Sequence, residues 1–134
     1  MSDSIFDKLI SGEIPCYKVY EDEHNLSFLD NKPHTKGHTI VIPKKKGVTI
    51  FDHDSENLNS LILAVKKTME ILKDKLHPDG FNVGWNHGTA GGQVVPHLHI
   101  HIMPRYNGDG GGSMHSIISN PGNLSAEEVA QLLE

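Results

Sequence analysis

Pro96-His97-Leu98-His99-Ile100-His101-Ile102-Met103-Pro104 is the stretch of sequence from which the fold can be predicted. Its three histidines alternate with apolar residues. Successive side chains of a β-strand point to opposite faces, so the stretch predicts a strand with one aliphatic face and one face of imidazoles. On a helix the same rings would spread over roughly 200° and could not act together. We therefore expect the aliphatic face to lie on a hydrophobic core, with the histidines together on the other side.

Aligned imidazoles can support more than one kind of chemistry. Neutral imidazole acts as a nucleophile, a base or a metal ligand. Alternate strand positions are about 7 Å apart, where two imidazolium charges would repel by roughly 2.4 kcal/mol at an effective dielectric of about 20. We therefore expect one neutral nucleophile, with neighbouring histidines that hold an anion. Two alternatives are a strand of merely hydrogen-bonded histidines and a zinc site, to which His87 or His115 could add a ligand.

Length and composition indicate one globular domain. The chain has 134 residues, of which 37% are hydrophobic and 22% charged, and its formal net charge is −5. We expect a single domain over residues 1–134, with a loose C-terminal segment over residues 106–124. The acidic balance and the lack of a basic arm argue against a nucleic-acid partner. The single cysteine excludes an internal disulfide framework, and without a signal-peptide pattern or a membrane-spanning run we expect a cytoplasmic protein with no membrane partner.

The remaining elements predict an α+β fold. Ser4 is positioned to cap a short helix over residues 5–10, and apolar residues at helical spacing from Leu58 to Leu76 predict one long helix that packs on a sheet. The capping-box pattern from Ser125 to Glu128 predicts a final helix over residues 129–133. Hairpin-length connections favour an antiparallel sheet. Besides the histidine strand, we expect strands over residues 17–20, 26–29, 38–42 and 81–85.

These motifs, taken in order, resemble those of the histidine triad (HIT) family. The match runs from Ile5 to about Asp109 and includes, besides the histidine stretch, Ile5-Phe6, Glu13-Ile14-Pro15, Phe28-Leu29-Asp30, Gly37-His38-Thr39, Val41-Ile42-Pro43-Lys44 and Gly92-Gln93. The resemblance implies a five-stranded antiparallel sheet and, usually, a homodimer. It also implies an enzyme that cleaves at the α-phosphate of a purine nucleotide conjugate, either a nucleoside phosphoramidate or a dinucleoside polyphosphate. It implies neither a cofactor nor a metal.

The resemblance also assigns roles to individual residues. His99 would be the nucleophile that forms a covalent nucleotidyl-histidine, and His101 would contact the α-phosphate. His97 would orient His99 and assist the leaving group, with His38 behind His97. The remaining expected nucleotide contacts are Asn86, Gln93 and Val94 at the phosphate, Asp30 at the ribose hydroxyls, and Phe6, Leu9, Ile14 and Phe28 around the base.

Two positions depart from the family pattern. Val94 follows Gln93 where many members carry a serine or threonine, so that only a backbone N–H is left to bind phosphate there. The N-terminal stretch over residues 3–7 lacks the Cys-x-x-Cys of a bacterial-type branch, which argues against that branch's structural zinc. Val94 leaves open a second interpretation, a nucleotide-binding or scaffold protein with little turnover, and a histidine metal site is a third.

Overall fold

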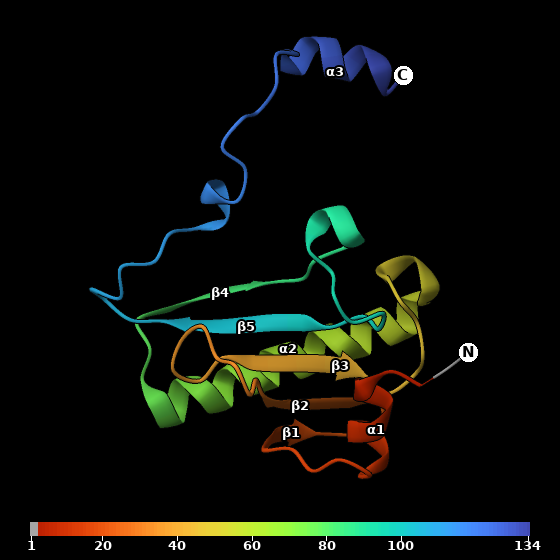
Figure 1. Ribbon diagram of the computed structural model, residues 1–134, viewed down its shortest axis with the longest axis vertical. Coiled ribbons are helices and arrows are strands. Elements are labelled where there is room, and N and C mark those ends of the chain that lie inside the picture. The colour runs from red at the N-terminus through yellow and green to blue at the C-terminus, as the bar shows by residue number, and fades with distance from the viewer. Residues whose placement is uncertain (1–2) are drawn as a thin grey trace.

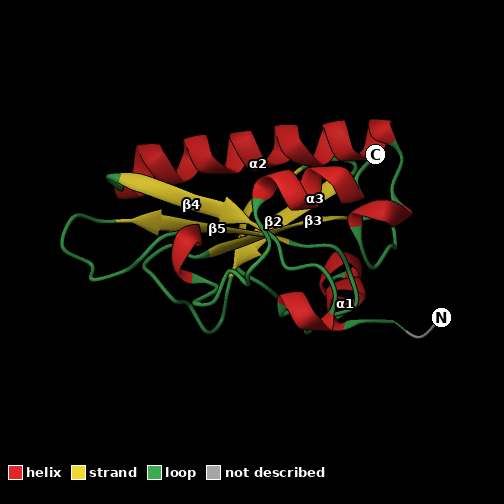
Figure 2. Cartoon of the chain, turned by 90° about the horizontal axis from the view of Figure 1, so that it is seen from above, coloured by secondary structure: helices red, strands yellow, loops and turns green. Residues whose placement is uncertain are grey.

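The computed structural model describes residues 3–134 and confirms the predicted α+β fold. A five-stranded antiparallel sheet has the strand order β1-β2-β3-β5-β4, with α2 across one face and α1 on the other (Figures 1 and 2). The strands are β1 (Lys18–Glu21), β2 (Asn25–Leu29), β3 (Thr39–Pro43), β4 (Gly80–Gly84) and β5 (Ile100–Arg105). The helices are α1 (Ile5–Ser11), α2 (Ser55–Leu76) and α3 (Ala126–Leu132), with short 3-10 turns η1 (Ile50–Asp52), η2 (Thr89–Gly91) and η3 (Met114–Ser116).

Helix α2 supplies one half of the main core. It begins after Asp54, whose side chain accepts a hydrogen bond from the Asn57 N–H, and it ends at His77 in a left-handed conformation. Its apolar face is buried against the sheet, and full burial of each large aliphatic side chain contributes about 1.5–3 kcal/mol. The buried cluster comprises Leu61, Ala64, Val65 and Leu72 from α2 with Val41, Leu98, Ile100 and Ile102. Within the described part of the chain, no helix combines the length and apolar character needed to span a bilayer.

Strand β5 is shorter than predicted. Residues 97–99 alternate as expected but lie outside the ladder, because β3 pairs with β5 only as far as Val41 opposite Ile100. Beyond that point the backbone finds another partner, and the Leu98 N–H donates to the Gly47 carbonyl at 2.9 Å. Leu98 still faces the core under α2, so the alternation was read correctly although the strand boundary was not.

Helix α1 covers part of the opposite face of the sheet. Ser4 forms a capping box with Asp7, and Gly12 ends the helix with φ at 83°, as the sequence indicates. Phe6 is the buried residue of α1, and it completes a second apolar cluster with Leu26, Phe28, Ile40 and Ile42. This cluster lies on the sheet face that also carries the histidines.

The C-terminal segment leaves the sheet after Arg105. Residues 107–134 are exposed throughout, and α3 stands away from the sheet (Figure 1, dark blue). The capping box from Ser125 to Glu128 forms as predicted, although α3 begins three positions earlier than expected, at Ala126. The start of the segment is fixed by Arg105, which donates to Asp109 Oδ2 at 2.8 Å and to Asp109 Oδ1 at 2.7 Å.

Gly37 occupies a crowded position with positive φ. Its φ is 88°, and a Cβ there would lie 2.5 Å from Leu76 Cδ1 and 3.2 Å from Pro104 Cγ. Gly12 has a similar φ of 83°, but a Cβ there would meet nothing within 4 Å. The two glycines therefore share the backbone requirement and differ in packing.

Replacing Gly37 with alanine should lower the free energy of unfolding by at least about 2 kcal/mol, because overpacking adds to the cost of positive φ. Gly12→Ala, the matched control, should lose only about 1 kcal/mol. Urea unfolding measures both losses. Equal losses would show that Gly37 is needed for its backbone conformation alone.

His53 is buried under the Gly47 backbone without a hydrogen-bond partner. The residue is 8% exposed, and neither ring nitrogen has a partner within residues 3–134. A Cβ on Gly47 would come within 2.5 Å of His53 Nε2, so the histidine ring fills the space that a side chain at position 47 would need. Burial lowers the pKa of His53, and a positive charge on His97 would lower it further. The ring is therefore neutral at pH 7 and held by packing.

Replacing His53 with leucine should raise the free energy of unfolding, with a gain that grows as the pH falls. Below the ordinary pKa of 6.5 the unfolded chain binds a proton that the folded chain does not, so wild-type stability is lost with acidification and the variant avoids this loss. At about pH 7.5 we expect a gain of about 1 kcal/mol from removing two unpaired buried atoms. Urea unfolding at about pH 7.5 and about pH 5.5 measures it. His24→Leu, at a side chain that is 63% exposed, is the control; a gain independent of pH would contradict the assignment.

Candidate active site

Four histidines gather on the face of the sheet opposite α2. His97 and His99 lie just before β5, His101 lies within it, and His38 immediately precedes β3. Three of them are almost completely buried, with 1% exposure for His38, 2% for His97 and 7% for His99. The rings of His99 and His101 meet edge to face with centroids 5.1 Å apart. The structure thus brings the three histidines of the sequence stretch and His38 into one cluster.

Two backbone carbonyls determine where His97 and His99 carry their protons. His97 Nε2 lies 2.8 Å from the Pro43 carbonyl oxygen, and His99 Nδ1 lies 2.7 Å from the His97 carbonyl oxygen. A carbonyl can only accept, so each of these nitrogens must donate. Burial also lowers the pKa of His99, which keeps the ring neutral at pH 7. His99 Nε2 therefore keeps an unprotonated lone pair, the requirement for a nucleophile.

A second pair of hydrogen bonds determines the protonation of His101. The His34 backbone N–H donates to His38 Nδ1 at 3.2 Å, so the proton of neutral His38 is on Nε2. His38 Nε2 lies 3.0 Å from His101 Nδ1 and donates to it, which leaves His101 Nε2 as an N–H donor. Burial, followed by the effect of positive charge on His99 and His38, lowers the pKa of His101 to about 4. The cluster thus places a neutral hydrogen-bond donor, His101 Nε2–H, beside the neutral ring of His99.

The position of His38 corrects one expectation. The resemblance placed His38 behind His97, whereas the structure has it hydrogen-bonded to His101. The reason is strand register: Ile40 of β3 lies opposite His101, and His38 is two residues earlier on the same face. Sequence spacing does not specify the register between distant strands, so this contact could not be predicted from the sequence alone.

Aromatic and aliphatic side chains enclose His99 on the α1 side. The Phe6 ring contacts His99 with centroids 5.0 Å apart, His97 at 5.9 Å and Phe28 at 5.8 Å. Leu9 packs against the same cluster from α1. Ile14, the fourth residue expected around a base, follows the end of α1 and is half-buried. Phe6 and Phe28 are thus buried core residues beside the histidines, and none of the four residues expected around a base lines the cleft described below.

The side-chain amide of Gln93 forms three hydrogen bonds within the chain, which brace a loop. Its Oε1 accepts from the Gly88 N–H at 3.0 Å, and its Nε2 donates to the carbonyls of Val48 at 2.7 Å and Val95 at 3.1 Å. Both hydrogens of the amide are therefore used within the chain. Val94, the next residue, is 89% exposed. No amide hydrogen of Gln93 is therefore left for the expected contact with a phosphate. The side chain instead holds the glycine-rich connection in place.

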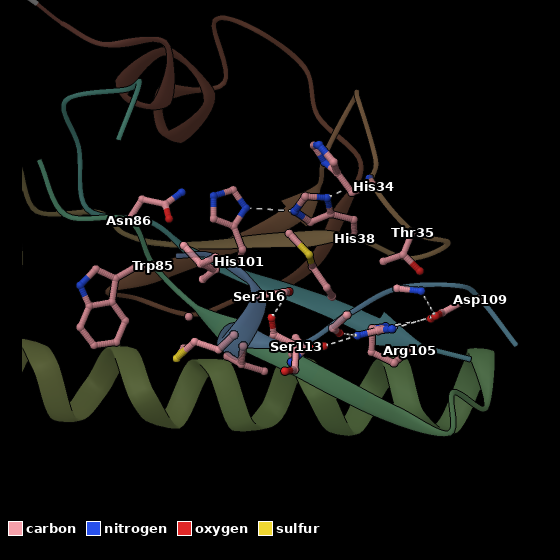
Figure 3. A pocket seen from close by; sticks show the side chains of 18 of the residues that line it. His34, Thr35, His38, Trp85, Asn86, His101, Arg105, Asp109, Ser113 and Ser116 are labelled. Carbon is pink, nitrogen blue, oxygen red and sulfur yellow. Dashed lines mark hydrogen bonds and ion pairs between the residues drawn. The ribbon is translucent and has the colours of Figure 1, made fainter. Parts of the chain in front are cut away.

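A cleft of about 590 Å³ opens beside His101 and His38 (Figure 3). Asp30 and Asn86 also line it, and in the view of Figure 3 the Asn86 amide lies on the side of His101 away from His38. His99 is not among the residues that line this cleft. The cleft therefore brings together the Asp30 carboxylate, the Asn86 amide and the His101 donor, and the buried His99 lies behind them.

Asp30, His38 and His101 could be considered as a cation site. Each offers a ligand atom, and these atoms lie within 4.8 Å of one another. However, the His34 N–H fixes the proton of His38 on Nε2, the nitrogen that faces His101 and lies 3.7 Å from Asp30 Oδ2. A protonated nitrogen has no lone pair for a metal, so this trio is better suited to hydrogen bonding than to cation binding.

Comparison with known proteins gives concordant matches. The model of the HIT domain matches residues 11–108. An uncharacterised HIT-like protein of Methanocaldococcus jannaschii is 53% identical over 106 residues, which cover 79% of this chain and 81% of that protein. An adenosine 5′-monophosphoramidase of Schizosaccharomyces pombe is 37% identical over 103 residues, which cover 77% of this chain and 74% of that protein.

Solved structures agree with these matches. A HIT family member from Bacillus subtilis superimposes with a TM-score of 0.85 at 38% identity, covering 98% of this chain and 93% of that chain. A histidine triad nucleotide-binding protein from Candida albicans superimposes with a TM-score of 0.81 at 30% identity, covering 98% of this chain and 92% of that chain. Sequence motifs, fold and relatives agree, and the chain belongs to the HIT family.

Proposed function

We propose that this protein is a nucleotide hydrolase or transferase that cleaves at the α-phosphate of a purine nucleotide conjugate through a covalent nucleotidyl-His99. The observation that carries the proposal is the hydrogen bond from His99 Nδ1 to the His97 carbonyl, which leaves Nε2 of a neutral imidazole unprotonated. The activity named for the fission yeast relative, an adenosine 5′-monophosphoramidase, supports the choice of reaction class. A single domain and a cytoplasmic location belong to the same proposal.

The first step is attack of His99 Nε2 on the α-phosphorus. A phosphorus–nitrogen bond forms to His99, the bond to the leaving group breaks, and the leaving group takes the electron pair and a proton from water. Positive charge then develops on the His99 ring, where the bond from Nδ1–H to the His97 carbonyl strengthens and stabilises it. In the second step water attacks the phosphorus, releases His99 and completes the nucleoside monophosphate.

The neighbouring groups have distinct roles in this scheme. His101 Nε2–H donates to a non-bridging phosphate oxygen, and His38 positions His101 through their 3.0 Å hydrogen bond. The Asn86 amide, which lines the cleft, supplies a second donor to the phosphate. His97 acts through its carbonyl, because its ring is 2% exposed and donates to Pro43. Asp30, 21% exposed at its side chain, accepts from the ribose hydroxyls.

A nucleotide-binding protein with little turnover is the second candidate function. It is favoured by Val94, which offers no hydroxyl and is 89% exposed, and by Gln93, whose amide hydrogens are used within the chain. Fewer donors to the phosphate would leave binding by the apolar cluster intact while slowing chemistry. Tight binding of adenosine monophosphate without adenylation of His99 on any conjugate would favour this candidate.

We also propose that the protein is a homodimer. Strand β4 is an edge of the sheet, and Val83 on it and Trp85 just after it are 36% and 42% exposed. The C-terminal segment exposes further apolar side chains, among them Ile117, Ile118 and Leu133 at 73%, 72% and 82%. An open edge next to unpartnered apolar side chains is a surface that proteins normally pair or cover.

His99→Ala should lose about 10³-fold or more of the turnover of adenosine 5′-phosphoramidate, because the covalent route is removed. Intact-protein mass spectrometry of quenched wild-type reactions should detect an adenylate on His99. His24→Ala, an exposed histidine on the hairpin between β1 and β2, is the matched control and should retain full activity. Retention of most activity by His99→Ala would reject His99 as the nucleophile.

Light scattering should give a molar mass of twice the 14.8 kDa of one chain. Val83→Glu on β4 should shift the mass toward that of one chain, because it buries a charge in the proposed interface. Ile62→Glu, on an exposed position of α2 at 55%, is the control and should leave the mass unchanged. A wild-type mass of 14.8 kDa at all concentrations tested would contradict the dimer.

A further inference from the structure

One peptide unit connects the His99 tautomer to a distant segment of the chain. The His97 carbonyl oxygen, which lies 2.7 Å from His99 Nδ1, shares this unit with the Leu98 N–H. That N–H donates to the Gly47 carbonyl at 2.9 Å. A peptide unit is planar, so the hydrogen bond at its N–H sets the direction of its carbonyl. Gly47 therefore orients the carbonyl on which the proposed nucleophile depends.

The backbone around Gly47 is held by the 3-10 turn η1. A Cβ on Gly47 would lie 2.5 Å from His53 Nε2 and 3.0 Å from His53 Cδ2, so the imidazole packs directly against this glycine. The preceding residue, Asp52, accepts from the Val48 N–H at 2.9 Å and from the Thr49 N–H at 3.0 Å through its Oδ2. The loop that carries the Gly47 carbonyl is thus fixed by hydrogen bonds to Asp52 and by the His53 ring.

A histidine is a costly residue for this packing role. His53 is 8% exposed, and neither ring nitrogen has a hydrogen-bond partner within residues 3–134. Buried polar atoms without partners lower stability and call for an explanation, and a leucine would fill a similar space without that cost. What histidine adds is a proton that can bind close to neutral pH. The ring therefore combines a packing role with the capacity to respond to acid.

The charged and titratable groups around His53 come from each neighbouring segment. They are His97 before β5, Lys45 between β3 and η1, and Asp52 and Asp54 on either side in the sequence. Burial is the largest effect on the pKa of His53 and lowers it, positive charge on His97 and Lys45 lowers it further, and the two carboxylates oppose this. The site therefore accommodates the neutral ring, whereas a protonated ring is stabilised by leaving it.

We propose that His53 is a positioning residue for the reaction, whose neutral ring supports Gly47 and so holds the peptide unit between His97 and Leu98, and whose protonation removes this support and slows the reaction. The inference rests on the proposed function and adds to it a control by pH. When the protonated ring leaves its site, the Gly47 carbonyl loses its packing partner and the bond to the Leu98 N–H loosens. The His97 carbonyl then no longer holds His99 in one orientation, and small displacements of a reacting group cost much of its rate.

The first test compares the pH dependence of kcat for adenosine 5′-phosphoramidate in the wild-type protein and in His53→Leu. Leucine fills the site without titrating, so the two kcat values should agree within about 2-fold at about pH 7.5. Between about pH 7.5 and about pH 5.0 the wild-type kcat should fall at least about 3-fold further than that of the variant. Protonation of His99 acts in both proteins, so the difference between them reports His53. His24→Leu, at a side chain that is 63% exposed, is the control and should follow the wild type.

The second test measures hydrogen exchange of the Leu98 amide by NMR, which does not depend on turnover. An opening that frees His53 restores its ordinary pKa of 6.5, so the opening equilibrium should rise by up to about tenfold per pH unit below that value. Protection of the Leu98 amide, corrected for the intrinsic exchange rate, should fall accordingly in the wild type and by less than about 2-fold per pH unit in His53→Leu. The Val65 amide, in the interior of α2, reports global unfolding and should stay more strongly protected.

The outcomes separate this inference from the proposed function. A smaller acid loss of kcat in His53→Leu, with acid-dependent exchange of the Leu98 amide in the wild type alone, supports the role of His53. Parallel acid losses of kcat in the two proteins, or a Leu98 protection that does not change with pH in the wild type, overturn that role and leave the proposed function standing. Absence of adenylated His99 in the wild type at about pH 7.5 overturns both.

Discussion

A carbonyl oxygen accepts hydrogen bonds and cannot donate them, and the chemistry proposed for this site depends on that asymmetry. The His97 carbonyl holds the Nδ1 proton of His99 and thereby frees Nε2. This carbonyl is available because residues 97–99 lie outside the sheet, where no neighbouring strand competes for it. The strand boundary that sequence patterning missed thus serves the proposed chemistry, since a longer β5 would have engaged the His97 carbonyl in the ladder.

Burial keeps His38, His99 and His101 uncharged. The sequence suggested a neutral nucleophile flanked by histidines that hold an anion. Protonated, positively charged histidines would have been one way to hold that anion. Burial instead lowers the pKa values of His38, His99 and His101, with that of His101 lowered to about 4. His38 and His101 are therefore neutral donors with fixed tautomers. Such preorganised dipoles need little rearrangement as charge develops in the reaction.

Local patterns predicted most of the fold and part of the site. Apolar residues at helical spacing from Leu58 to Leu76 predicted α2. The alternation of histidines with apolar residues over 97–102 placed the three histidines on one face. Both signals are local, because helix and strand periodicity depend only on nearby residues. The partner of His38 and the contacts of Gln93 depend on how distant segments meet, and no spacing along the chain encodes that. The contribution of the glycine-rich segment after Arg105 to the cleft is another such contact.

The most direct test of this account is the protonation of the histidine rings, measured by nitrogen–proton correlation NMR of the free protein at about pH 7. The account predicts a neutral His99 that is protonated on Nδ1 only, and neutral His38 and His101 that are each protonated on Nε2 only. A proton on Nε2 of His99, whether as the other tautomer or as an imidazolium, would remove the lone pair from which the proposed chemistry starts and would contradict it.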